Sequence, residues 1–187
     1  MVRIICGLAK GRKISIPKGL EVRPTLDRVK ESIFNILFHR FDGARVLDLY
    51  AGSGNLGLEA LSRGASEVVF VEKDKCNTVI IQKNLDLLGF KNANICPLPV
   101  FTYLRRFTAR PFDIIFVDPP YSCYEHIKFV EELFSVILDR SALVQNGMIV
   151  IEHPSRNHFD FPMEMLQLYK HRCYGQTAVS FVEFVGS

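Results

Sequence analysis

The stretch from Arg45 to Arg63 constrains the fold more than any other part of this 187-residue chain. Residues 46–50 are an apolar run with one acid, and residues 51–55 are small and turn-forming. A segment of good helix formers follows, so the order predicts a buried strand, a glycine turn and a helix. Open α/β sheets bind ligands in the crevice at the carboxyl ends of such strands, so we expect a ligand site here.

The glycines of this turn allow two ligand-binding interpretations. Gly52, Gly54 and Gly57 spell Gly-x-Gly-x-x-Gly, a pattern of dinucleotide-binding proteins that is weak on its own. Asp48 favours another interpretation, because Asp-x-x-x-Gly-x-Gly resembles the first motif of class I S-adenosylmethionine (SAM) methyltransferases. A turn without a ligand is the simplest alternative, but three glycines would then lower stability without a ligand to explain them.

Strands and helices alternate along most of the remaining chain. Apolar runs predict strands at residues 67–71, 93–96, 112–117 and 147–151. Helical spacing predicts helices at about 25–39, 74–88, 101–107 and 125–138. Residues 166–174 and 177–185, separated by Gly175-Gln176, predict an antiparallel hairpin. The pattern indicates an α/β fold with a mostly parallel sheet, helices on both faces and an antiparallel edge.

Basic residues are concentrated at the N-terminus. Residues 1–40 contain nine Lys/Arg and three Asp/Glu, a net charge of +6, whereas the remainder contains 14 and 17, a net charge of −3. A basic arm on a slightly acidic body suggests a polyanionic partner, although a solvated charged surface would give the same count. We expect residues 1–22 to form a basic β-hairpin extension and residues 23–187 to form the main domain.

Several classes of protein are disfavoured by composition. The five cysteines are scattered without a Cys-x-x-Cys pair, and the five histidines lack metal-ligand spacing. No apolar run approaches the length of a membrane span, and the N-terminus lacks the apolar region of a signal peptide. We therefore expect a cytoplasmic protein with reduced cysteines, no metal and no membrane association.

The most specific local signal is Asp118-Pro119-Pro120-Tyr121, directly after the predicted strand 112–117. The prolines stiffen the loop and cannot continue the sheet. The Asp118 carboxylate and a backbone carbonyl can each accept a hydrogen bond from a planar exocyclic amine, while the Tyr121 ring stacks on the base. We expect this loop to hold an amino group in line with a methyl donor, by orientation and electrostatic complementarity. The sequence leaves open whether Asp118 or water takes the proton.

An acid also closes the predicted strand 67–71. A carboxylate at the position of Glu72 can accept hydrogen bonds from both ribose hydroxyls of a nucleoside cofactor. An ordinary exposed glutamate is the alternative. The residues that we expect to contact the cofactor are Asp48, Tyr50, Ala51, Gly52, Gly54 and Glu72.

With both motifs placed, the chain resembles the RsmD family of bacterial 16S rRNA (guanine-N2)-methyltransferases over nearly its whole length. The matching segments include Arg3-Ile4-Ile5-x-Gly7, Gly11-Arg12-Lys13, Arg23-Pro24-Thr25-x-Asp27-Arg28, Asp48-x-x-Ala51-Gly52-Ser53-Gly54, Val117-Asp118-Pro119-Pro120 and Gly175-Gln176-Thr177. The Arg-Pro-Thr and Asp-Pro-Pro-Tyr blocks are specific together, and neither is specific alone.

The resemblance implies a Rossmann-like, seven-stranded class I SAM methyltransferase fold with a small N-terminal extension. It implies methylation of a guanine 2-amino group in 16S rRNA, on an assembled or partly assembled 30S subunit. Residues 118–121 would hold the guanine, and we expect the protein to act as a monomer. The basic positions that would meet rRNA are Arg3, Arg12, Lys13, Arg23 and Arg28.

The sequence departs from the usual class I pattern at one position, and three alternative functions remain open. Many class I enzymes place an acceptor for the adenine amine just after the third strand, but residues 97–99 are Pro-Leu-Pro and offer no such side chain. The nearest alternative is a DNA adenine amino-methyltransferase, which shares Asp-Pro-Pro-Tyr. An NAD-dependent oxidoreductase would use the three glycines but leave residues 118–121 unexplained. A non-catalytic RNA-binding module would not need Asp118.

Overall fold

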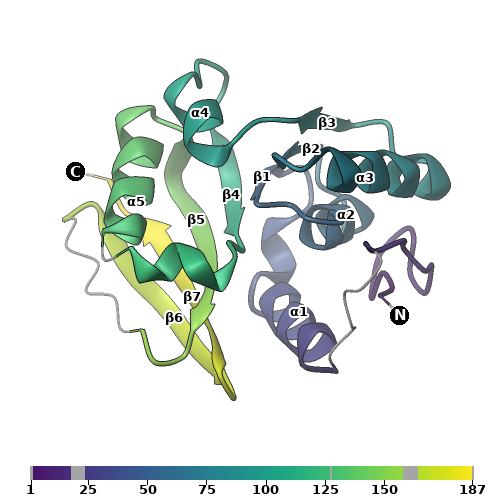
Figure 1. Cartoon of the computed structure of the whole chain (residues 1–187), viewed down its shortest axis with the longest axis horizontal. Helices are drawn as coiled ribbons and strands as arrows, with labels where there is room; N and C mark the ends of the chain where they lie inside the picture. Colours follow the sequence, from purple (N-terminus) through teal and green to yellow (C-terminus); the bar gives the residue numbers. More distant parts are fainter. Residues whose placement is uncertain (1, 18–23, 127, 158–163, 187) are drawn as a thin grey trace.

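The protein is built around a single sheet. The computed structural model describes residues 2–17, 24–126, 128–157 and 164–186. Seven strands lie in the order β3-β2-β1-β4-β5-β7-β6 (Figure 1). They are β1 (Arg45–Leu49), β2 (Glu67–Val71), β3 (Ala93–Cys96), β4 (Phe112–Val117), β5 (Leu143–Pro154), β6 (Leu166–Tyr174) and β7 (Thr177–Phe184). Strands β1 to β5 are parallel to one another, whereas β7 is antiparallel to both β5 and β6, which confirms the predicted α/β architecture.

Helices cover both faces of the sheet. One hydrophobic core lies under α1 (Pro24–Ile36), α2 (Asn55–Ser62) and α3 (Lys75–Leu88). The other lies under α4 (Val100–Arg105) and α5 (Phe129–Asp139). Because successive side chains of a strand point to opposite faces, Phe116 packs in the first core and Val117 in the second. The central strands β1, β2 and β4 are thus buried on both faces, as their apolar sequences predict, whereas β3 and β6 at the two edges are more exposed.

The N-terminal segment 2–17 is less regular than a hairpin of two strands. Its pairing is limited to one antiparallel bridge between Arg3 and Lys13 and a few backbone hydrogen bonds. Several of its apolar side chains, including Ile4 and Ile14, are buried in the first core, whereas Leu8 is exposed. Gly7 lies so close to α2 that an added Cβ would be 1.7 Å from the Ser62 carbonyl oxygen. The segment is therefore packed onto the sheet-and-helix body.

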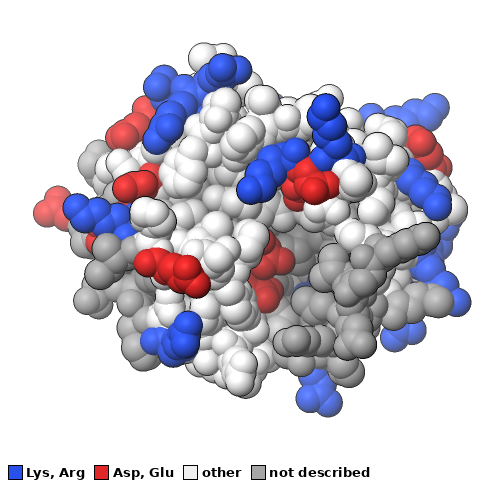
Figure 2. All heavy atoms as spheres, in the orientation of Figure 1, with Lys and Arg blue, Asp and Glu red and all other residues white. Residues whose placement is uncertain are grey.

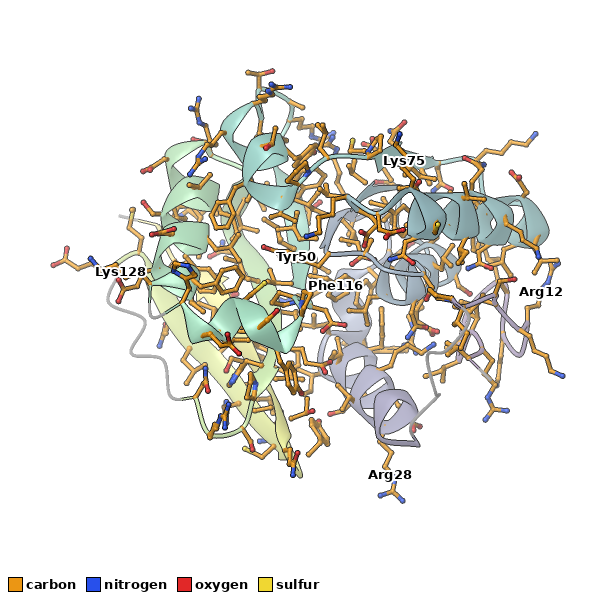
Figure 3. All side chains as sticks on the ribbon, in the orientation of Figure 1. Arg12, Arg28, Tyr50, Lys75, Phe116 and Lys128 are labelled. Atoms are coloured by element: carbon orange, nitrogen blue, oxygen red, sulfur yellow. The ribbon has the colours of Figure 1, made fainter. Side chains whose placement is uncertain are left out.

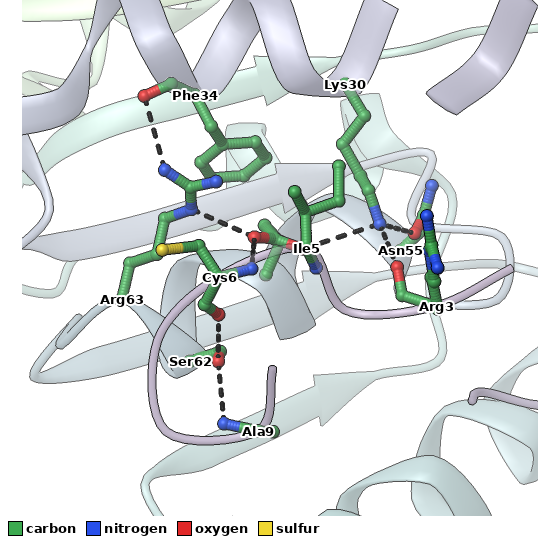
Figure 4. A network of polar contacts seen from close by, with 10 residues as sticks. Arg3, Ile5, Cys6, Ala9, Lys30, Phe34, Asn55, Ser62 and Arg63 are labelled. Atoms are coloured by element: carbon green, nitrogen blue, oxygen red, sulfur yellow. Dashed lines mark hydrogen bonds and ion pairs between the residues drawn. The ribbon is translucent and has the colours of Figure 1, made fainter. Parts of the chain in front are cut away.

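A buried ionic cluster fastens this segment (Figure 4). The Glu59 carboxylate accepts hydrogen bonds from the backbone N–H groups of Ile5 and Cys6, at 2.8 and 3.0 Å. It also pairs with Arg63 at 2.9 Å and with Lys30 at 3.4 Å. Lys30 in turn donates to the Arg3 carbonyl at 2.6 Å and to the Asn55 side chain at 2.9 Å. The expected boundary between residues 22 and 23 lies outside the described residues, so the division into two domains stays a prediction.

Two elements differ from their predicted bounds. The loop after β4 continues as a 3-10 helix, η2 (Tyr121–Glu125), so α5 begins at Phe129 and not near residue 125. A second 3-10 helix, η1 (Phe38–Arg40), ends the stretch that the sequence predicts as one helix with α1. Strand β5 is longer than its apolar run because it pairs with β7 as far as Pro154. None of the described helices is both long enough and apolar enough to cross a bilayer.

Candidate active site

The carboxyl ends of β1, β4 and β5 form the centre of the site. The register pairs Leu49 with Val117 and Val117 with Ile151. The residues that follow, Tyr50, Asp118 and Glu152, therefore lie next to one another across three strands. Figure 2 shows acidic atoms in the hollow at the middle of this face, with many of the Lys and Arg atoms towards its margin.

A pocket of about 780 Å³ opens beside these strand ends, which we call the large pocket. One side consists of the glycine turn and the end of β2, with Tyr50, Gly52 and Glu72. The opposite side consists of apolar residues between β3 and α4, including Leu98 and Phe101. Residues 118–120 close one end. A polar side and an apolar side at this size suit a nucleoside-containing ligand.

The two glycines of the turn have different roles. Gly52 has a φ of 54° and lines the large pocket, and a Cβ added there would meet no atom closer than 4.0 Å. Gly54 has a φ of 80° and precedes α2, where an added Cβ would be 3.2 Å from the Phe70 ring. Gly52 therefore gives a ligand access to the backbone, whereas Gly54 allows close packing of the turn.

Tyr50 lies between the glycine turn and the loop of residues 118–121. It adopts a φ of 59°, in the left-handed region that side chains rarely occupy. It lines the large pocket and also a second pocket of about 40 Å³, the small pocket, which contains Ala51, Asp118 and Glu152. Strained residues of this kind are concentrated at ligand sites, and Tyr50 is placed accordingly.

Asp48 lies behind the turn and is 2% exposed. Its carboxylate accepts a hydrogen bond from the backbone N–H of Gly57 at 2.9 Å, in the first turn of α2. Burial, opposed by this hydrogen bond and reinforced by Asp118 and Glu72, raises the pKa of Asp48 well above its usual value. A dinucleotide pyrophosphate would need these N–H groups at the helix start, so the position of Asp48 disfavours that ligand.

The loop of residues 118–121 touches both pockets. Asp118 lines the large and the small pocket, and Pro119 and Pro120 line the large one. Burial raises the pKa of the Asp118 carboxyl to about 6. Tyr121 lies at the rim, 46% exposed, and its hydroxyl is 2.6 Å from the Thr177 hydroxyl of β7. Neither pocket includes Tyr121 among its described lining residues, so its stacking role stays a prediction.

Two polar residues of the site were not predicted. Glu152 ends the apolar part of β5, and burial, with the neighbouring charge of Asp118, raises its pKa to about 8. Lys30 lines the small pocket from α1 and is 1% exposed. In the sequence Glu152 lies 34 residues beyond Asp118, and only the register of β4 and β5 brings the two acids together.

The predicted RNA-binding residues are spread around the margin. Arg3, Arg12, Lys13 and Arg28 are exposed, and Figure 3 shows Arg12 and Arg28 pointing outwards, far from the central Tyr50. The Arg12 guanidinium donates a hydrogen bond to the Leu87 carbonyl near the end of α3. Arg28 lines an open groove of about 500 Å³ between α1 and β6, together with Lys170 and Arg172. Arg23 lies outside the described residues.

The chemistry of the large pocket fits SAM. Glu72, 9% exposed, offers carboxylate oxygens where a ribose would need acceptors, and Gly52 leaves open space beside it. Leu98 and Phe101 can contact an adenine ring, whereas residues 97–99 supply no side-chain acceptor for its amine. Among the described residues, no group of three or more His, Cys, Asp or Glu side chains is arranged to hold a metal ion.

Comparisons with known proteins agree with this geometry. Residues 2–183 match the model of a family described as "Conserved hypothetical protein 95". The chain is 37% identical to a putative rRNA methyltransferase of Bacillus subtilis, over 96% of this chain and 97% of that protein. It is 38% identical to ribosomal RNA small subunit methyltransferase D of Haemophilus influenzae, over 81% and 78% of the two chains.

A solved structure supports the fold independently. The structure of a putative methyltransferase from Escherichia coli superposes with a TM-score of 0.86 at 32% identity, and covers 100% of this chain and 99% of that one. The seven-stranded sheet with an antiparallel C-terminal edge is therefore a class I SAM methyltransferase fold. The matching family model, the relatives and the motifs at both pockets together show that the chain belongs to the RsmD family.

Proposed function

We propose that the protein transfers the methyl group of SAM to the 2-amino group of a guanine in 16S rRNA. The observation that carries this proposal is the position of Asp118, which lines both the large pocket and the small pocket. A methyl donor in the large pocket and an amine held by the loop would meet there. The names of the relatives support rRNA as the substrate.

In this proposal the protein acts by positioning. When bound, SAM supplies a methyl group activated by its sulfonium. Asp118 and a backbone carbonyl of the loop hold the two amine protons, so that the nitrogen lone pair points at the methyl carbon. A C–N bond forms as the C–S bond breaks, sulfur keeps the electron pair, and the amine loses one proton to Asp118 or to water. The fixed carboxylate stabilises the positive charge that develops on nitrogen.

The substrate would be the 30S subunit or an assembly intermediate, bound by one copy of the protein in the cytoplasm. Arg3, Lys13 and Arg28 would contact phosphates from the margin of the site, and the groove that Arg28 forms with Lys170 and Arg172 would extend this path. Arg12 would add to the positive potential that attracts rRNA. Arg23 is proposed as an rRNA-binding residue from the sequence alone.

The test uses labelled SAM and 30S particles from a strain that lacks the activity, followed by digestion of the rRNA to nucleosides. We expect label in N2-methylguanosine. The Asp118→Ala variant should lose at least about 100-fold in turnover while still binding 30S particles. Label in DNA and not in 30S particles would instead support an adenine methyltransferase. Unchanged turnover in the variant would overturn the assigned role of Asp118.

A further inference from the structure

The small pocket contains a second carboxyl group beside the proposed amine-binding group. Asp118 and Glu152 follow the paired residues Val117 and Ile151 of adjacent strands, so they lie side by side, with Glu152 still paired to β7. Phe116 and Val150, two residues earlier on the same strands, have their side chains in the core beneath α1. Side chains two residues apart on a strand point to the same face, so Asp118 and Glu152 point to that face as well. The two carboxyl groups therefore point to the same face and line the same pocket.

Neither carboxyl group is engaged in the part of the chain that the structure describes. No described residue donates a hydrogen bond to the side-chain oxygens of Asp118 or Glu152, and the Tyr124 hydroxyl donates to the backbone carbonyl of Glu152 and not to its carboxyl group. Among the described residues, every fully buried side-chain oxygen has a hydrogen-bond partner. The carboxyl oxygens of Asp118 and Glu152 have none, so they are not fully buried and are open to the pocket that both residues line. By contrast, the third acid of the pocket, Asp48, is already bonded to Gly57.

Two neighbouring acceptors match one edge of guanine. The 2-amino group of guanine lies next to a ring nitrogen, N1, that also carries a hydrogen, so the two donors are adjacent and parallel. In adenine the ring nitrogen next to the amine carries no hydrogen and is an acceptor. The small pocket, at about 40 Å³, has room for the edge of a base and not for a whole nucleoside.

We propose that Glu152 is a specificity-determining residue that accepts the N1–H of the target guanine while Asp118 accepts an N–H of its 2-amino group. The inference rests on the proposed function and adds the means by which the site selects guanine. A protonated Glu152 could also donate to an N1 that lacks a hydrogen, so the base comparison is made above pH 8, where Glu152 is a carboxylate that only accepts hydrogen bonds. A site built to hydrogen-bond a donor rejects analogues that lack it, because its own polar group is then left unpaired.

The experiment compares two target bases in reconstituted 30S particles, after the modified nucleotide has been located. One particle carries guanosine at that position, and the other carries 2,6-diaminopurine, which keeps the 2-amino group but has no hydrogen on N1. We expect the wild-type protein to prefer guanosine by about 10- to 100-fold in kcat/KM. Glu152→Ala should lose most of the guanosine rate, so that the preference falls towards one.

A second variant separates recognition from folding. Glu152→Gln keeps the shape of the side chain and one acceptor, and it adds an amide donor that can bond N1 of diaminopurine. Its preference for guanosine over diaminopurine should therefore fall, because the rate on diaminopurine rises. SAM affinity should stay unchanged in both variants, because Glu152 is not among the described residues that line the large pocket. Glu131→Gln, an exposed acid at the start of α5, is the matched control and should behave as the wild type.

The outcomes are distinct. An unchanged preference in both Glu152 variants, whether the rates fall together or stay intact, would overturn the assignment of N1–H to Glu152. A wild-type protein that methylates neither particle but binds SAM would instead overturn the proposed function.

Discussion

Glu72 and Gly52 are joined by a hydrogen bond of 2.9 Å from the Gly52 backbone N–H to one carboxylate oxygen of Glu72. The other oxygen accepts the backbone N–H of Asp74 at 2.7 Å. The acid that the sequence predicts as a ribose ligand therefore also fixes the glycine turn and the start of the segment leading to α3. Each oxygen retains a lone pair for a ligand, so the two roles are compatible.

Replacing Glu72 by Ala should weaken SAM binding by at least about tenfold, because charge-assisted hydrogen bonds to ligand and turn are lost together. Isothermal titration with SAM and S-adenosylhomocysteine measures this. Asp86→Ala, which removes an exposed acid of α3, is the control and should leave affinity unchanged. Wild-type affinity in Glu72→Ala would exclude a cofactor role for this residue.

Activity should fall as the medium becomes acidic. Burial raises the pKa of Asp118 to about 6, so its carboxylate form, the proposed amine acceptor, is depleted below that pH. We expect kcat/KM to fall about tenfold per pH unit below pH 6 and to level off above it. The groups that face Asp118 in the small pocket are Asp48, Glu152 and Lys30.

The Glu152→Gln variant checks the origin of that inflection. Burial raises the pKa of Asp118, and Glu152 is still protonated near pH 6, so the inflection should stay near pH 6 in this variant. The same variant should be more stable than the wild type near pH 8 and equal to it near pH 4. The folded-state pKa of Glu152 is raised to about 8, so the wild-type protein loses stability as pH rises from the unfolded pKa towards 8. An inflection that moves away from pH 6 would contradict its assignment to Asp118, and a stability profile that does not respond would contradict the raised pKa of Glu152.

Gly57 is required by packing and not by a ligand. A Cβ added there would be 2.3 Å from the Phe70 ring and 2.9 Å from Val68. Gly57→Ala should destabilise the protein by about 1–3 kcal/mol, measured by denaturant unfolding, despite the better helix propensity of Ala. The double variant Gly57→Ala/Phe70→Leu should recover part of this loss. The single variant Phe70→Leu completes the double-mutant cycle. Additive effects would show that the two positions are not in contact.

Lys170 and Arg172 should contribute to binding of the ribosomal substrate. Both line the groove that also contains Arg28, on the surface between α1 and β6. Replacing each by Ala should weaken 30S binding and reduce the slope of log affinity against log salt by about one for each phosphate that the protein no longer neutralises. SAM affinity should not change. Lys91→Ala, which removes an exposed cation after α3, is the matched control, and an equal loss in that variant would point to net charge alone.

The sequence predicted the sheet well because its strands are short apolar runs between clear turn signals. The bounds of β2, β3 and β4 are as predicted, whereas β5 is longer because its start pairs with Phe112 of β4 and its end pairs with β7. The start of α5 was wrong by four residues, since apolar spacing does not reveal that the loop after Pro120 forms a 3-10 turn. The N-terminal segment has hairpin spacing, but its burial against α2 replaces most of the expected pairing.

The site was predictable where motif residues follow one another along the chain. Gly52, Glu72 and residues 118–120 lie at the same pocket, as expected of strand ends in one sheet. Glu152 and Lys30 were missed because no local pattern marks them: a glutamate after a strand and a lysine on a helix are ordinarily exposed. Their burial follows from register and from the packing of α1, which are properties of the folded chain.

The buried Lys30 ammonium joins Arg3 to Asn55, the first residue of α2 and the neighbour of Gly54. The Asn84 side chain makes a second connection, because it is hydrogen-bonded to Ser15 and to the Ser53 carbonyl of the turn. If RNA binds the N-terminal segment as proposed, we therefore expect a displacement of that segment to shift the turn beside the large pocket.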